Sequence, residues 1–250
     1  MIERSIKKHF DKFSTNDFAI IFKSYAKAKL NTTGLNNFFN FFIEKNINNF
    51  TYFELVDVLI HYPRLISHDV FKYELFFKLY SQTIQGIDKL EINRLVNLYF
   101  VLYGGNDQKI TENIQYEPRL LQLILKKEEN IKSKHIYLLI LTHHFSRIPL
   151  NNDLITVLKE FLQKEIRTFL PDEINGIINI INDDKNQVLF SKIDKLLVNN
   201  IYLENIKEDI KSMDSKEIIL YLHTLIPNKG KHFLIKIVSS FLKISTVHIN

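Results

Sequence analysis

The stretch ELVDVLIHY at residues 54–62 decides the fold of this chain, because it recurs along the sequence. DFAIIFKSY at residues 17–25 and EINRLVNLY at residues 91–99 repeat its order: acid, apolar, two variable residues, two apolar residues, two variable residues, Tyr. These copies stand 37 residues apart, and looser copies follow at His135, Glu173 and Glu217. A period of about 20–50 residues is the sequence signature of a stacked repeat array.

Each copy predicts an α-helix. In residues 54–62 the residues Leu55, Val58, Leu59 and Tyr62 fall at i, i+3, i+4 and i+7, which places them on one stripe of a helix. The helix starts also have the form of a capping box, in which the first side chain and an acid three residues later each accept a main-chain N–H of the other. Four pairs have this form: Ser14 and Asp17, Thr51 and Glu54, Asp88 and Glu91, Asp214 and Glu217.

A second apolar stripe follows each first helix. Leu35, Phe38, Phe39 and Phe42 form the first of these stripes, and the matching residues of the next copy are Tyr73, Phe76, Phe77 and Tyr80. Later second helices are expected within residues 120–124, 154–161, 193–197 and 233–241. Because one helical hairpin cannot bury both of its faces, neighbouring hairpins must stack.

The predicted fold is therefore all-α, an α-solenoid of about six helical hairpins with repeats of 37–44 residues. We expect one continuous array over residues 1–250, with repeats that start near residues 14, 51, 88, 132, 170 and 214. Residues 1–13 are basic and amphipathic, and they form either a capping helix or an import presequence. Glu3 and Asp11 argue against a presequence, since transit peptides contain few acids. Residues 104–117 are an insertion, either a surface excursion or a contact element, and Pro118 suits the first turn of the helix that follows.

Composition excludes several classes of function. The chain has no Cys, so disulfides, thiol nucleophiles and Cys-ligated metals are excluded. No apolar run approaches the roughly 18 residues of a membrane helix, so we expect no membrane insertion. The net charge is +5, and the excess lies at the ends: residues 1–50 hold eight Lys or Arg against four acids, and residues 229–250 hold four Lys and no acid. Such ends suit an anionic partner, although solvated surface lysines explain them almost as well.

No residue pattern predicts catalysis, a metal or a cofactor. The pair His143 and His144 is adjacent, and adjacent residues of a helix point about 100° apart. His143 occupies the stripe position that Tyr holds in earlier copies, so we expect it in the core. The acids at the helix starts are interpreted as caps. We therefore expect no enzyme, no catalytic residues and no cofactor.

The hairpin period and the start motif, as in TYFELVDVLIHY at residues 51–62, resemble the heptatricopeptide-type repeats of protist organelles. They are more distantly similar to pentatricopeptide and octotricopeptide arrays, and the resemblance covers residues 14 to about 245. The resemblance implies an organellar RNA-binding protein, of a kind that often acts on mitochondrial transcripts or ribosomal RNA. Together with the basic ends and the absence of catalytic groups, it leads us to expect a structural component of the mitochondrial ribosome that holds rRNA. Members of the family often end in a further compact domain, and we expect none within residues 1–250.

Cations on the predicted helices and turns are the candidate RNA contacts, because they suit phosphates. They are Lys23, Lys27, Lys29, Arg64, Arg94, Arg119, Lys126, Lys127, Arg147, Lys229, Lys231 and Lys236. The alternative function is a protein–protein scaffold subunit of a large organellar complex without direct RNA contact. Apolar residues outside the stripes favour it, as inter-hairpin core or as a docking surface: Ile60, Leu98, Leu138, Leu141 and Leu220.

Overall fold

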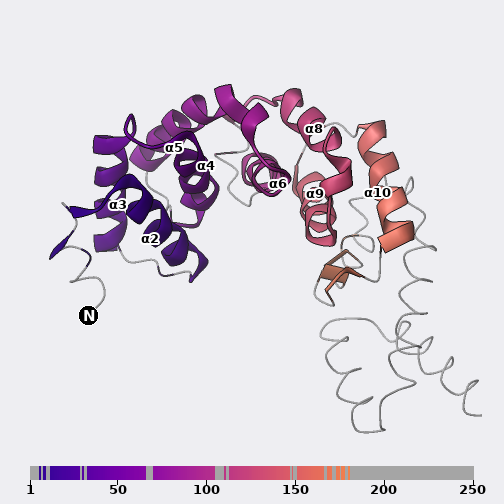
Figure 1. The fold of residues 1–250 in the computed structure, drawn as a ribbon, viewed down its shortest axis with the longest axis horizontal. Helices are drawn as coiled ribbons and strands as arrows, with labels where there is room; N and C mark the ends of the chain where they lie inside the picture. Colours follow the sequence, from indigo (N-terminus) through magenta and orange to yellow (C-terminus); the bar gives the residue numbers. More distant parts are fainter. Residues whose placement is uncertain are drawn as a thin grey trace, which may run out of the picture. The chain divides into compact units, whose positions relative to one another are not determined.

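The computed structural model describes residues 6–180 except 7, 10–11, 29, 31–32, 66–69, 105–109, 111–112, 147, 149–150, 166–167, 171–172, 175, 178–179 and the side chains of residues 33 and 70–72. All regular elements in this part of the chain are helices (Figure 1), so the all-α prediction is confirmed there. The chain divides into two compact units, Met1–Leu154 and Ile155–Asn250. The expected single array over residues 1–250 stays a prediction.

The main helices are α2 (Thr15–Lys27), α3 (Thr33–Asn46), α4 (Tyr52–His61), α5 (Val70–Thr83), α6 (Ile92–Tyr99), α8 (Pro118–Leu125), α9 (Ser133–Phe145) and α10 (Asn152–Glu165). Short segments of tighter 3-10 helix lie between them: η2 (Tyr62–Arg64), η3 (Ile84–Lys89) and η5 (Glu128–Asn130). A π-helix, η4 (Phe100–Gly104), continues α6. Of the expected N-terminal capping helix, the described positions Ile6, Lys8 and His9 are helical.

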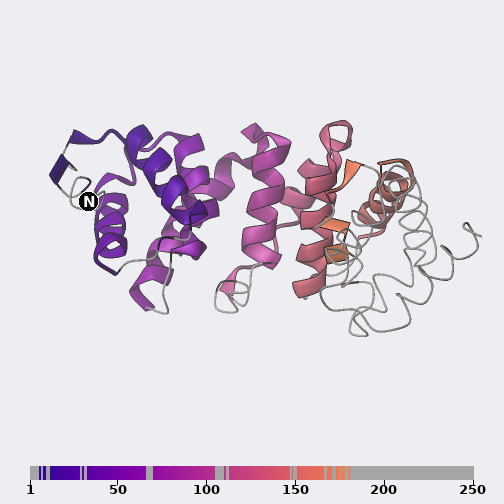
Figure 2. The ribbon, with the colours of Figure 1, turned by 90° about the horizontal axis from the view of Figure 1, so that it is seen from below.

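The first helices of successive copies pack on one another within the first unit. Helix α2 contacts α4, α4 contacts α6, and α6 contacts α9. Each of α4 and α6 also packs on the helix that follows it in the chain, α5 and α8, and α3 packs on α5. Figure 1 and Figure 2 show these helices following one another in chain order. Helices α4 and α6 are thus each covered both from their own copy and from the next.

Two of the four predicted capping boxes are confirmed. Ser14 Oγ accepts the Asp17 N–H at 3.2 Å, and Asp17 Oδ2 accepts the Ser14 N–H at 3.1 Å. Thr51 Oγ1 and Glu54 Oε2 make the same pair of bonds, at 3.4 and 2.8 Å. The hydrogen bonds from Ser14 also lower the pKa of the Asp17 carboxyl.

The third predicted box is wrong. Asp88 lies inside η3, and α6 begins with Glu91 as its N-cap, without a side-chain bond. The reason is that α5 runs on into η3 as far as Lys89, so residue 88 is still helical when the box would require an extended N-cap. The fourth pair, Asp214 and Glu217, lies outside the described residues.

Two later copies have no capping-box pair in the sequence, but the residue at the repeat position of Asp17 and Glu54 still caps the helix start. His135 Nδ1 accepts the Lys132 N–H at 3.0 Å, and Glu173 Oε2 accepts the Leu170 N–H at 3.0 Å. One half of the capping box therefore persists at the starts expected near residues 132 and 170. Pro118 occupies the first turn of α8, as predicted.

The core confirms the first-helix stripes and corrects the register of the second helices. Tyr62 and Tyr99 are 1% and 0% exposed, and Tyr25 is 9% exposed. In the second helices, Phe39 of α3 and Phe76 of α5 are fully buried. The predicted alignment of Phe39 with Phe77 is therefore wrong by one residue, because Phe77 is only half-buried. Phe39 and Phe76 stand 37 residues apart, so the period of the first helices also holds for the second.

None of the described helices is long and apolar enough to cross a membrane.

Candidate ligand-binding surface

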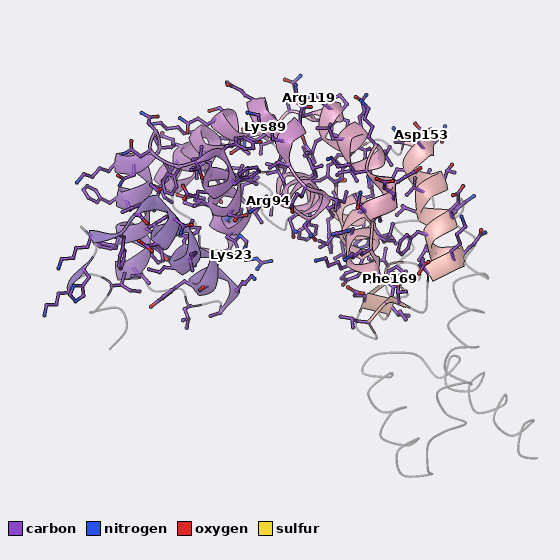
Figure 3. All side chains as sticks on the ribbon, viewed as in Figure 1. Lys23, Lys89, Arg94, Arg119, Asp153 and Phe169 are labelled. Atoms are coloured by element: carbon purple, nitrogen blue, oxygen red, sulfur yellow. The ribbon has the colours of Figure 1, made fainter. Side chains whose placement is uncertain are left out.

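Charged side chains link α2, α4 and α6, which are the first helices of the first three copies. Asp57 of α4 stands at their centre and binds Arg94 of α6 through two parallel bonds, Nε to Oδ1 at 3.0 Å and Nη2 to Oδ2 at 3.1 Å. Lys23 of α2 approaches the same carboxylate at 3.9 Å. Figure 3 shows Lys23 and Arg94 on the same part of the first unit. Asp57 and Arg94 stand 37 residues apart, so one repeat position carries opposite charges in neighbouring copies.

The pairing holds Arg94 in place. Its side chain is 29% exposed and that of Asp57 is 21% exposed. The hydrogen bonds to Asp57 raise the pKa of the Arg94 guanidinium. The guanidinium carbon also lies 5.2 Å from the centre of the Phe53 ring, a cation–π arrangement. An anionic ligand would therefore have to compete with Asp57 for Arg94, whereas Lys23 is less tightly held.

The ion pair between Asp57 and Arg94 should stabilise the stacking of α4 on α6. In a double-mutant cycle of Asp57→Asn and Arg94→Gln, we expect a coupling free energy of about 1 kcal/mol, the upper end for partly exposed pairs, because the geometry is bidentate. Urea unfolding of the four proteins, followed by circular dichroism, gives this number. The exposed pair of Lys164 and Glu160 in α10, 3.9 Å apart, is the matched control and should couple by less than about 0.5 kcal/mol. Equal couplings would contradict a role for Asp57 in joining the helices.

Two exposed cations stand at a single repeat position. Lys27 is the last residue of α2, and Arg64 ends η2 directly after α4, so each lies at the C-terminal end of a first helix. They stand 37 residues apart, both are exposed, and their helices pack on each other. This regularity makes them the strongest of the predicted phosphate contacts among the described residues.

The other described cations lie elsewhere. Arg119 donates to the main-chain oxygen of Ile84 at 3.0 Å and approaches Asp88 at 3.8 Å. Figure 3 shows Arg119 and Lys89 along the opposite edge of the unit from Lys23 and Arg94. Lys126 is exposed and Lys127 half-buried, both just after α8. The remaining predicted contacts lie outside the described residues: Lys29, Arg147, Lys229, Lys231 and Lys236.

A buried cluster of aromatic hydroxyls joins α6, η4 and α9. His143 is 7% exposed, which confirms its predicted place in the core, and its Nε2 lies 3.1 Å from the hydroxyl oxygen of Tyr99. The Tyr103 hydroxyl accepts the Glu117 N–H at 2.9 Å, and its ring packs edge-on against Tyr116. Burial raises the pKa of the Tyr99 and Tyr103 hydroxyls. These tyrosines stay neutral and serve as hydrogen-bonding core residues.

The described part of the insertion at residues 104–117 packs on the unit. Ile110 and Ile114 are 1% and 7% exposed, and Tyr116 contacts the buried cluster. These residues are packed into the unit and do not form a free loop.

Two of the four described apolar residues outside the stripes belong to the core. Ile60 and Leu98 are buried, while Leu138 and Leu141 are half-buried; Leu220 lies outside the described residues. Large apolar side chains that are exposed stand on separate elements: Ile20, Leu30, Phe41, Phe53, Phe145 and Leu170. Within the described residues, no group of three or more His, Asp or Glu side chains is arranged to hold a metal ion.

Comparisons with protein-family models, with curated proteins and with solved structures found no match to this chain.

Proposed function

We propose that this chain is an α-solenoid of about six helical hairpins that binds RNA without catalysing a reaction. We further propose that it works in a mitochondrion, as a structural component of the ribosome that holds rRNA. The resemblance of residues 14 to about 245 to heptatricopeptide-type repeats motivates the RNA and the organelle. The stacking of α2 on α4, α4 on α6 and α6 on α9 supports the solenoid in the first unit.

The observation that carries the proposal is the pair of exposed cations Lys27 and Arg64, one repeat apart at the ends of stacked helices. A stacked array presents the same position of each copy on the same side, so such cations form a row. A row of cations suits a polyanion, whose phosphates also repeat at regular intervals. Contacts of this kind position RNA without reading its sequence, and they make binding dependent on salt.

The test is a salt titration of RNA binding. Wild-type protein should bind a single-stranded RNA with an affinity that falls steeply as salt rises, and Lys27→Ala with Arg64→Ala should reduce the log–log slope by about 0.7 for each phosphate that the variant no longer neutralises. Neutralising Lys229, Lys231 and Lys236, which lie outside the described residues, should reduce it in the same way. Lys164→Ala is the matched control, because Lys164 is 72% exposed beside Glu160. Circular dichroism checks that the variants fold.

Unchanged slopes in both charge variants would show that these cations do not contact RNA. Tight binding of wild-type protein that does not respond to salt would contradict the phosphate mechanism as a whole.

The alternative is a protein–protein scaffold in a large organellar complex. The exposed side chains of Ile20 and Phe53, 57% and 45% exposed on α2 and α4, favour it, since apolar surface is costly unless a partner covers it. Crosslinking the native particle and sequencing any attached RNA distinguishes the two functions. Recovery of protein neighbours without RNA would support the scaffold.

A further inference from the structure

Two histidines, one near each end of α9, form hydrogen bonds across the contact between α6 and α9. At the start of α9, His135 is 1% exposed and its Nε2 lies 2.7 Å from Asn93 Oδ1 on α6. At the end of α9, His143 Nε2 lies 3.1 Å from the Tyr99 hydroxyl, also on α6. Both hydrogen bonds cross between the helices, and both involve buried imidazoles.

The geometry requires His135 to be neutral. Its Nδ1 accepts the Lys132 N–H at 3.0 Å, so that nitrogen carries no proton, and Nε2–H donates to Asn93. A second proton could only enter at Nδ1, where it would face the Lys132 N–H. The site is also the N-terminus of a helix, where the free amides disfavour a cation. Burial, together with the charges of Lys134 and Lys132, lowers the pKa of His135 to about 4.

Among the described residues, His143 has no partner that would stabilise a charge. Its Nδ1 is buried without a hydrogen-bond partner among the described residues, so a proton added there would have no acceptor. The groups that α6 and η4 bring to this end are the neutral hydroxyls of Tyr99 and Tyr103, with Tyr116 and Glu117 beyond them. Burial lowers the pKa of His143 to about 4.

Two other charged groups of α6 lie near this contact. On α6, Arg94 is paired with Asp57, and Glu91 is exposed at the N-cap. Neither is among the groups that shift the pKa of His135. A third buried histidine, His61, belongs to α4, where its Nδ1 lies 2.9 Å from the main-chain oxygen of Asp57.

We propose that the contact between α6 and α9 is a proton-sensitive joint, which holds while His135 and His143 are both neutral and loosens when either takes up a proton. The sign follows from linkage: both groups bind protons more tightly when the joint is open, at an ordinary pKa near 6.5, than when it is closed. The contribution of the two histidines is therefore complete above pH 6.5 and is lost as the pH falls toward 4.

Native-state hydrogen exchange of the full chain tests this joint. Between pH 7 and pH 5, after correction for intrinsic exchange, we expect protection of the α9 amides to fall on the order of tenfold for each histidine. The variant His135→Asn keeps an acceptor for the Lys132 N–H, and His143→Gln keeps a partner for Tyr99, and neither titrates. In the double variant the protection of α9 should be the same at both pH values.

Two single variants serve as controls. His144→Asn changes the half-buried neighbour on the same helix, and His61→Asn removes the buried histidine of α4; both should leave the response of α9 as in wild type. Protection of α9 that does not change with pH in wild type would overturn the proposal, and so would a double variant that responds as strongly as wild type. Should the double variant fail to fold, the NMR titration of the wild-type histidines decides: midpoints of His135 and His143 well below 6.5 support the joint, and midpoints near 6.5 overturn it.

Discussion

Replacing Tyr62 by alanine is expected to lower the free energy of unfolding by about 3–5 kcal/mol, the range for truncating a large buried aromatic side chain. Tyr62 is 1% exposed. Its ring stacks between Phe22 of α2 and Phe76 of α5, with ring centres 6.2 and 6.3 Å away. Its hydroxyl donates to Asn40 Oδ1 of α3 at 2.9 Å. Because one side chain contacts three helices from two copies, its loss leaves a cavity that no single helix can close.

Two variants separate the parts of this effect. Tyr62→Phe keeps the ring and removes the hydroxyl that donates to Asn40, so it should lower the free energy of unfolding by about 0.5–1.5 kcal/mol. Phe41→Ala removes a ring that is 57% exposed and should change the stability by less than about 0.5 kcal/mol. Urea unfolding monitored by circular dichroism measures all three variants. If Tyr62→Ala lowered the free energy of unfolding by no more than Phe41→Ala does, the Tyr62 ring would not hold the two copies together.

Replacing Gly104 by alanine is the second large effect expected. A Cβ at residue 104 would lie 2.5 Å from the Cα of Thr142 and 3.0 Å from the Phe100 ring. The first of these atoms is main chain of α9 and cannot rotate away, so η4 and α9 would have to separate. We expect a loss of about 1–3 kcal/mol, as for other overpacked sites, and a larger loss for Gly104→Val.

Gly86→Ala is the matched comparison. A Cβ at residue 86 would also be too close to its neighbour, at 2.6 Å, but that neighbour is the ring of Tyr52. Tyr52 is a half-buried side chain, so its ring can shift by a few tenths of an ångström, although its hydroxyl donates to the Thr83 oxygen at 2.9 Å. Thermal unfolding should therefore show a smaller fall in Tm for Gly86→Ala than for Gly104→Ala. The reverse order would contradict the close approach of η4 to α9.

The candidate site was only partly predictable. The sequence named Lys23, Lys27, Arg64 and Arg94 among the candidate phosphate contacts. It did not show that Arg94 forms an ion pair with Asp57, because an ion pair between residues 37 positions apart depends on how two helices pack. Nor did it show that Arg119 bonds to the main chain of η3. Free and engaged cations look alike in a sequence, since their partners are set by tertiary contacts.

The sequence by itself determined the apolar stripes of the first helices in the first three copies, and so the face that each of these helices buries. The spacing of apolar residues in 17–25, 54–62 and 91–99 is a local property, and so are the capping bonds of Ser14 with Asp17 and of Thr51 with Glu54, which span three residues. Local patterns of this kind need no knowledge of distant contacts. The burial of His143 also followed, because it stands at the Tyr position of the repeat.

Only the tertiary structure decided where α6 begins, which face of the second helices is buried, and how α9 is held. Helix α6 begins later than predicted because α5 continues into η3. Neighbouring aromatic residues such as Phe38–Phe39 and Phe76–Phe77 do not by themselves show which of the two is buried, because this depends on the helix that packs against them. The bonds of His135 to Asn93 and of His143 to Tyr99 join residues 42 and 44 positions apart. Such contacts depend on the positions of whole helices, which result from packing and not from any local pattern.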